Sequence, residues 1–99
     1  MNPVYIVDSI RTPRAQANQK GGLNKLNPYE LLDFLYKNIE SKNFFNLKSI
    51  DEVILGCVTQ FGEQAGNIAK ASSLFSGYPD SISGLTINRF CSSSLDAIN

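Results

Sequence analysis

Histidine and tryptophan are absent from this 99-residue sequence, and cysteine occurs only twice, as Cys57 and Cys91. Without histidine, the chain cannot by itself assemble a Ser–His–Asp triad, a Cys–His pair or a histidine metal site. The two cysteines lie in separate predicted elements without C-x-x-C spacing, which favours two free thiols in a reducing compartment over a disulfide or a metal site. A reactive thiol here must therefore find its proton-transfer partner outside these residues.

Net charge is also absent, because nine Lys and Arg residues balance nine Asp and Glu residues. This balance gives no electrostatic reason to bind nucleic acid or an anionic membrane, so neither is expected as a partner. The apolar runs are too short to cross a bilayer and no signal-peptide pattern opens the chain, so we expect a cytoplasmic protein. Hydrophobic residues at 42% and charged residues at 18% are typical of one globular domain or less.

Three apolar runs predict strands. Val4–Val7 and the run 51–58 have the continuous apolar pattern of strands buried on both faces of a parallel or mixed sheet. Gly56 inside the second run indicates close approach of another backbone or a bulge, and Cys57 beside it is interpreted as a core residue. The third strand is predicted over 81–87.

Two helical patterns lie between these runs. Asn27, Pro28 and Glu30 have the spacing of an N-cap, a first-turn proline and a capping box, which predicts a helix to about Ser41. Its helically spaced apolar residues are expected to pack on the sheet as core: Leu31, Leu32, Leu35 and Ile39. A second helix of small residues is predicted after Asn67, with Gly77 as its C′ residue. The order β-α-β-α-β, followed by the start of a buried helix, predicts an α/β fold with right-handed crossovers.

Two polar segments connect these elements. The stretch 14–25 is interpreted as a solvated loop, with contact to a ligand as the lesser alternative. The stretch 59–66 follows the carboxyl end of the second strand, where ligand-contacting residues gather in open α/β sheets.

Cys91 stands at the turn between the third strand and the final helical pattern. Unpaired N–H groups and the positive end of a helix dipole at such a place favour a thiolate over a thiol, so Cys91 could be a nucleophile. The alternative is a small hydrophobic core residue, which is the commoner fate of a lone cysteine between a strand and a helix. Spacing alone leaves both interpretations open.

Several short patches, in order along the whole chain, resemble the N-terminal domain of thiolases, which are acetyl-CoA acetyltransferases and 3-ketoacyl-CoA thiolases. The Asn88-Arg-Phe-Cys-Ser-Ser93 patch is the most specific of them. The others are Arg11-Thr-Pro-Arg14, Gly56-Cys-Val-Thr59 with Gly62-Glu-Gln64, Asn67-Ile-Ala-Lys-Ala71 and Gly77-Tyr-Pro-Asp-Ser81.

The resemblance implies a CoA-dependent acyl transfer, as in fatty acid metabolism, with Cys91 as nucleophile and carrier of an acyl thioester. The Cys91 backbone N–H would donate to the oxyanion of the tetrahedral intermediate. CoA and acyl-CoA would be substrates, and no metal or prosthetic group is expected. The family's His, second Cys and water-orienting Asn belong to its C-terminal half. The resemblance therefore implies an incomplete half of the thiolase fold over 1–99, truncated inside a helix and without turnover by itself.

The resemblance also implies a homodimer or homotetramer whose interface includes the end of the third strand, namely Thr86, Ile87, Asn88 and Arg89. The chain departs from the family at Ala15 and Ser94, where glycine is usual. Ser94 adds a hydroxyl and volume where close packing is expected, and its oxygen could bond back to a carbonyl one turn earlier.

Two alternatives to an enzyme piece remain. The first is a truncated or decayed product that acts, if at all, as a non-catalytic interaction module, which the missing histidine supports. The second is a small self-contained α/β ligand-binding domain. It is the weakest reading, because three strands with an unfinished helix leave sheet edges and apolar faces uncovered.

Overall fold

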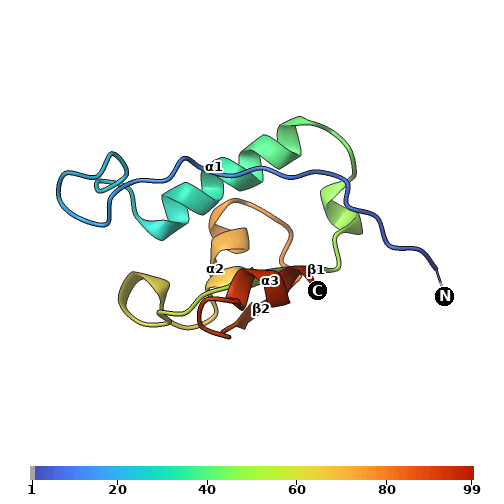
Figure 1. The fold of residues 1–99 in the computed structure, drawn as a ribbon. Helices are drawn as coiled ribbons and strands as arrows, with labels where there is room; N and C mark the ends of the chain where they lie inside the picture. The colour runs from blue at the N-terminus through green and yellow to red at the C-terminus, as the bar shows by residue number, and fades with distance from the viewer. Residues whose placement is uncertain (1) are drawn as a thin grey trace.

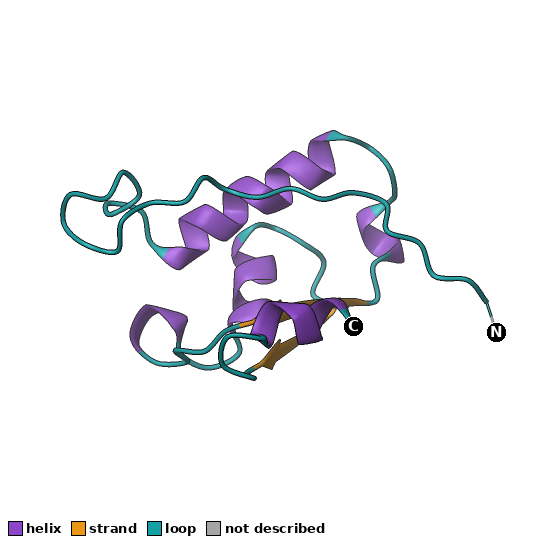
Figure 2. Cartoon of the chain, viewed as in Figure 1, coloured by secondary structure: helices purple, strands orange, loops and turns teal. Residues whose placement is uncertain are grey.

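Helices and strands alternate along the chain in the computed structural model, which describes residues 2–99 (Figures 1 and 2). The predicted α/β class is confirmed. The elements, with η for 3₁₀ helices, are α1 (Pro28–Ser41), η1 (Leu47–Ser49), β1 (Glu52–Gly56), η2 (Gly62–Gln64), α2 (Ile68–Phe75), β2 (Ser83–Ile87) and α3 (Ser93–Ile98).

Helix α1 begins with the predicted capping box. The Asn27 side chain accepts a hydrogen bond from the Glu30 N–H at 2.9 Å, and the Glu30 carboxylate accepts one from the Asn27 N–H at 2.9 Å. Both bonds satisfy N–H groups that the first turn of a helix leaves without a partner. The helix ends at Ser41, as predicted.

The buried face of α1 is centred one residue away from the predicted stripe. Tyr36 is its buried residue, while Leu31, Leu32, Leu35 and Ile39 are only half-buried. Tyr36 lies one turn beyond Leu32, and both contact the core, whereas Leu31 faces two cavities. Tyr36 is held in the core by its contacts outside the helix, because its ring packs against Tyr78 and its hydroxyl lies 3.0 Å from the Ser72 hydroxyl. The expectation that the whole leucine stripe forms core was therefore wrong.

Strands β1 and β2 pair in parallel, with Val53 opposite Gly84 and Gly56 opposite Ile87. A Cβ on Gly84 would lie 2.4 Å from the Lys70 backbone of α2, and a Cβ on Gly56 would lie 2.4 Å from the Ser93 backbone of α3. Because side chains alternate across a strand, these two directions point to opposite faces of the sheet. The sheet thus lies between α2 and α3, and α3 is drawn in front of the strands in Figure 1. Of the two alternatives predicted for Gly56, the close approach of another backbone is the one that the structure shows.

The core lies between α1 and the segment that joins α2 to β2. It is built on Tyr36, Tyr78 and Ile82, and the two tyrosine ring centroids are 5.0 Å apart. The Tyr36 hydroxyl lies 3.0 Å from the Ser72 hydroxyl, and the Tyr78 hydroxyl donates to the Tyr36 carbonyl at 3.0 Å. Burial therefore leaves neither phenol without a partner. Partly buried residues that pack against this cluster are Leu32, Leu47, Ile50 and Val53.

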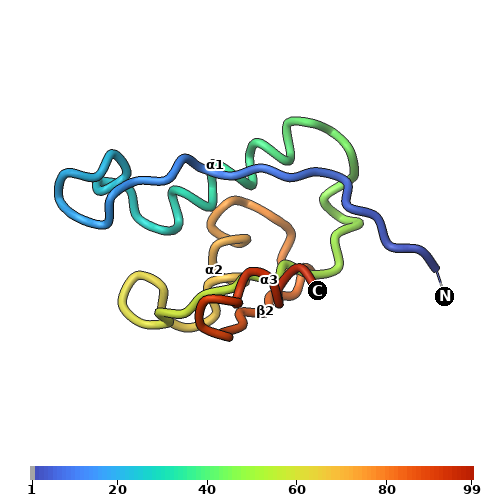
Figure 3. Tube along the Cα trace, in the orientation of Figure 1, coloured from blue at the N-terminus to red at the C-terminus, as the bar shows by residue number. Residues whose placement is uncertain are grey.

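The strand predicted at Val4–Val7 is not formed. This segment is irregular and open to solvent, with Val4 95% and Ile6 85% exposed. It lies beyond the C-terminal end of α1, where Asp8 pairs with Lys42 at 2.7 Å, and the chain that follows Asp8 runs alongside the helix (Figure 3). An apolar run becomes a buried strand only where a neighbouring strand and cover on both faces are available. Among residues 2–99, the sheet consists of β1 and β2, and the run Val4–Val7 pairs with neither strand.

The chain is extended and exposes an unusually large surface. Its principal extents are 45 × 29 × 23 Å, and its accessible surface is 7552 Å². A compact monomer of 10.9 kDa exposes only about 5,600 Å². Within residues 2–99, no helix combines the length and apolar character needed to cross a membrane. The excess surface includes large apolar side chains over both ends of the chain, such as Tyr5, Phe90 and Ile98.

The packing at Gly84 predicts a large effect of a small substitution. Gly84→Ala places a methyl group against the Lys70 backbone, which cannot move without shifting α2, so we expect a loss of about 1–3 kcal/mol in the free energy of unfolding. Gly22→Ala is the matched control, because a Cβ at Gly22 meets nothing within 4 Å. Urea unfolding of both variants checks this, and equal losses would contradict the proposed contact.

The tyrosine pair predicts a loss of stability at alkaline pH. Burial raises the pKa of Tyr36 and that of Tyr78 above the ordinary value of 10.0. Stability from keeping these phenols protonated is present below about pH 10 and is lost as the pH rises above it. Urea unfolding on both sides of pH 10 should show a smaller pH dependence for Tyr36→Phe than for wild type. Tyr5→Phe, which removes an exposed phenol, should leave the dependence unchanged.

Candidate active site

The candidate site lies at the edge of the sheet where both strands end. Because Gly56 pairs with Ile87 in a parallel register, the chain leaves β1 and β2 at the same edge. The Asn88 amide, just after β2, donates to the Val58 carbonyl, just after β1, at 3.4 Å. The loop 59–66 and the turn that carries Cys91 therefore start side by side, as the predicted parallel sheet requires.

The turn between β2 and α3 is held by short-range hydrogen bonds. The Asn88 side-chain oxygen accepts from the Phe90 N–H at 2.8 Å, and the Ser92 N–H donates to the Arg89 carbonyl at 3.0 Å. Phe90 has φ +46°, a left-handed backbone conformation that is uncommon for a residue other than glycine. Such a conformation persists only where the surrounding contacts enforce it.

Helix α3 is attached to this turn at two points. Ser93 is buried, and its hydroxyl contacts the backbone of Arg89 and of Phe90. Farther along the helix, the Asp96 carboxylate pairs with the Arg89 guanidinium. The Arg89 side chain is largely exposed, and an exposed ion pair contributes little to stability. The buried Ser93 contacts are therefore the stronger attachment of α3 to the turn.

Cys91 lies at the outside of the turn, two residues before the first helical residue of α3. Its side chain is exposed and its thiol is free. Among residues 2–99, its backbone N–H donates no hydrogen bond to another backbone or side-chain acceptor. The alternative of a small core residue is therefore wrong for Cys91. The arrangement presents a thiol and a free N–H donor from the same residue to solvent.

Cys57 has a different environment. It is half-buried at the end of β1, its N–H donates to the Ile87 carbonyl at 2.9 Å, and its thiol lies 3.6 Å from the Thr59 carbonyl oxygen. Its side chain lines a cavity of about 240 Å³ between α1, β1 and α2. The interpretation of Cys57 as a packed residue is thus confirmed in part, because the packing around it is incomplete.

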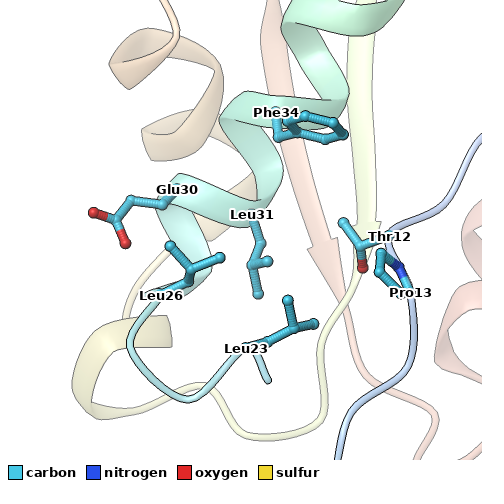
Figure 4. A pocket seen from close by; sticks show the side chains of 7 residues that line it. All are labelled: Thr12, Pro13, Leu23, Leu26, Glu30, Leu31 and Phe34. Atoms are coloured by element: carbon cyan, nitrogen blue, oxygen red, sulfur yellow. The ribbon is translucent and has the colours of Figure 1, made fainter. Parts of the chain in front are cut away.

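A second cavity, of about 280 Å³, lies between α1 and the N-terminal part of the chain (Figure 4). Apolar side chains of Leu23, Leu31 and Phe34 face Pro13 across it, while the Glu30 carboxylate points away. Cys91 lines neither cavity. The described residues also bring no three His, Cys, Asp or Glu side chains together as metal ligands.

The glutamine side chains of the loop 59–66 form hydrogen bonds with nearby backbone carbonyls. Gln64 donates to the Thr59 carbonyl at 2.7 Å, and Gln60 donates to the Cys57 carbonyl at 3.2 Å. These bonds stiffen the loop beside the Cys91 turn, with its tip at η2.

The remaining predicted residues differ in accessibility. The Thr86 hydroxyl donates to the Asn67 side chain at 2.7 Å and is thus engaged within the chain, whereas Asn88 and Arg89 are exposed. Ser94 is exposed, and within residues 2–99 its hydroxyl donates to no carbonyl one turn earlier. The serine that packs closely against β1 is Ser93. The sequence does not single it out, because nothing in the pattern distinguishes it from the two serines beside it.

Residues 4–99 match a protein family described as "Thiolase, N-terminal domain". The whole chain is 36% identical over 99 residues to a steroid 3-ketoacyl-CoA thiolase of Mycobacterium tuberculosis, of which it covers 24%. It is 43% identical over 100 residues to a 3-ketoacyl-CoA thiolase of Colwellia psychrerythraea, of which it covers 26%. The chain therefore spans about a quarter of the length of the curated relatives it matches.

The fold is similar to that of solved thiolases. The crystal structure of the Acat5 thiolase from Ascaris suum, determined in complex with coenzyme A, superposes with a TM-score of 0.70 and 33% identity. The superposition covers 80% of this chain and 20% of that one. The resemblance inferred from the sequence patches is confirmed.

The exposure of the two cysteines predicts different reactivities. Cys91 is open to reagents while Cys57 is half-buried, so iodoacetamide should alkylate Cys91 severalfold faster in the folded protein. Peptide mass spectrometry after brief treatment measures both sites in one sample. Unfolding in urea should remove the difference, and a faster reaction at Cys57 in the folded protein would contradict the geometry.

Proposed function

Because the chain belongs to the thiolase family, we propose that it supplies the nucleophile of a CoA-dependent acyltransferase that cleaves 3-ketoacyl-CoA or condenses two acyl-CoA molecules. The observation that carries the proposal is the exposed thiol of Cys91, on a braced turn at the carboxyl edge of the parallel sheet. Thiolate chemistry suits the reaction, because a thiolate is a good nucleophile and a good leaving group.

In the proposed reaction, the Cys91 thiolate attacks the 3-keto carbon of the substrate and the former carbonyl oxygen takes up negative charge. The C2–C3 bond then breaks, its electron pair leaves with acetyl-CoA and is protonated, and the shortened acyl group stays on Sγ as a thioester. The thiol of free CoA, once deprotonated, attacks this thioester and expels the Cys91 thiolate. Acyl-CoA is released and the nucleophile is regenerated.

The residues of this chain account for part of that chemistry. The free N–H of Cys91 is available to donate to the oxyanion, which is a large source of rate enhancement in acyl transfer. The proton transfers need a base and an acid, and the chain contains no histidine to serve. We therefore propose that the residues of a full-length thiolase that follow this domain supply them, and that residues 1–99 alone do not turn over.

We also propose that the full-length protein is a cytoplasmic homodimer or homotetramer, without a metal or prosthetic group, with Thr86–Arg89 near the subunit contact. The outer edge of β2 supports this placement, because β2 pairs only with β1 in the sheet of residues 2–99. The exposed side chains of Asn88 and Arg89 lie at the end of that edge. Thr86 would contribute its backbone groups to the subunit contact, since its hydroxyl is hydrogen-bonded to the Asn67 side chain.

A second candidate is a non-catalytic interaction module derived from a thiolase. The missing histidine and the large apolar surface favour it. These residues expose apolar side chains that a partner could cover, and they contain no histidine to act as a catalytic base. Treatment with acetoacetyl-CoA separates the two candidates.

The acyl transfer predicts a covalent adduct at one cysteine. Brief treatment of the protein, as its host produces it, with acetoacetyl-CoA should add one acetyl group to the peptide that holds Cys91, as seen by intact and peptide mass spectrometry. Cys91→Ser should abolish the adduct, because a hydroxyl is a far weaker nucleophile than a thiolate. Cys57→Ser is the control and should retain it. A host protein of 10.9 kDa without adduct would favour the non-catalytic candidate.

A further inference from the structure

Ser93 is the buried member of the three consecutive serines that follow Cys91. The residue is only 4% exposed, and its hydroxyl accepts a hydrogen bond from the Arg89 N–H at 2.9 Å. The same hydroxyl donates to the Phe90 carbonyl at 2.6 Å. Ser92 makes no side-chain bond at the start of α3, and Ser94 is exposed. One hydroxyl of the three thus uses both its donor and an acceptor position on the turn.

These two hydrogen bonds hold the backbone of the residues that determine the orientation of Cys91. Arg89 and Phe90 are the two residues immediately before it, and Phe90 has the left-handed φ of +46°. The Asn88 side chain holds the Phe90 N–H, and the Ser93 hydroxyl holds the Phe90 carbonyl. The peptide groups on both sides of the strained residue are therefore fixed by side chains. Losing either bond would free Phe90 to relax toward an ordinary backbone conformation and rotate Cys91 with it.

Ser93 is in turn held by the sheet. The absence of a side chain at Gly56 lets the Ser93 backbone lie where a Cβ would be only 2.4 Å away. This contact is between two main chains, one in β1 and one in the first turn of α3, so it has little freedom to adjust. The sequence of contacts runs from β1 through Ser93 to the turn and ends at Cys91.

We propose that Ser93 is a positioning residue for the acyl transfer at Cys91, a role that rests on the proposed function. Its hydroxyl fixes the orientation of the peptide group that contains the Cys91 N–H. The oxyanion that forms when the Cys91 sulfur attacks the substrate would then lie within hydrogen-bonding distance of this N–H. Such alignment is worth a large factor in rate, since a displacement of about 1 Å can cost about 100-fold. Ser93 itself touches no reacting atom.

The test compares two reactions of the same thiol in the full protein. Acetylation of Cys91 by acetoacetyl-CoA in a single turnover requires the alignment, whereas alkylation by iodoacetamide requires only an accessible thiol. Ser93→Ala should slow acetylation by about 10- to 100-fold and leave alkylation close to that of wild type. Ser94→Ala, which removes an exposed hydroxyl one residue away, should leave both rates unchanged.

A second pair of variants covers a failure of Ser93→Ala to fold. Ser93→Thr and Ser93→Val have nearly the same shape, and only the first keeps a hydroxyl. Faster acetylation of Ser93→Thr than of Ser93→Val, at similar alkylation rates, supports the positioning role.

The outcomes separate this inference from the function it rests on. If wild type is not acetylated at Cys91, the proposed function fails and the role of Ser93 fails with it. If wild type is acetylated and Ser93→Ala is acetylated equally fast, only the positioning role is overturned. A parallel fall in acetylation and alkylation would also overturn it, because Ser93 would then act on the thiol or the fold generally.

Discussion

The close contact of main chains at Gly56 is the constraint on which the candidate site depends. The first turn of α3 lies directly on β1 because no side chain separates them. A similar contact at Gly84 seats α2 on the opposite face. These two glycines allow a sheet of only two strands to hold a helix on each side, and the helix on one side begins just after Cys91. Any side chain at Gly56 would move α3 and, through Ser93, the turn that presents Cys91.

Features with local causes were predictable from the sequence, and features that need a distant partner were not. The capping box of Asn27 and Glu30 fixed the start of α1, because both hydrogen bonds join residues three apart. The apolar run Val4–Val7 predicted a strand, yet strand formation depends on pairing with a segment far away in sequence, and among the described residues this run pairs with none. Tyr36 replaced the leucine stripe at the centre of the core because its burial depends on Ser72 and Tyr78, which no helical periodicity reveals.

The candidate site shows the same division. The position of Cys91 between a strand and a helix followed from local patterns, and the resemblance of the Asn88–Ser93 patch to thiolases selected it as the nucleophile over the core interpretation. In the structure Cys91 is exposed and Cys57 is half-buried, which argues against the core interpretation for Cys91 and leaves its role as nucleophile a proposal. Ser93 could not be singled out from its two serine neighbours, because its burial is set by Gly56, 37 positions earlier in the sequence. A contact of that kind becomes visible only when the sheet is assembled.

The parallel pairing of β1 and β2 has a consequence for how the site comes into being. Paired residues such as Val53 and Gly84 lie about 30 positions apart, so the chain must close a long loop through α2 before the sheet exists. Non-local pairing of this sort forms slowly compared with helices and turns. The Cys91 turn takes its support from Gly56, and it therefore gains its final geometry only after the crossover is complete. The environment of Cys91 is therefore set late in folding, by a pairing of distant segments rather than by the turn alone.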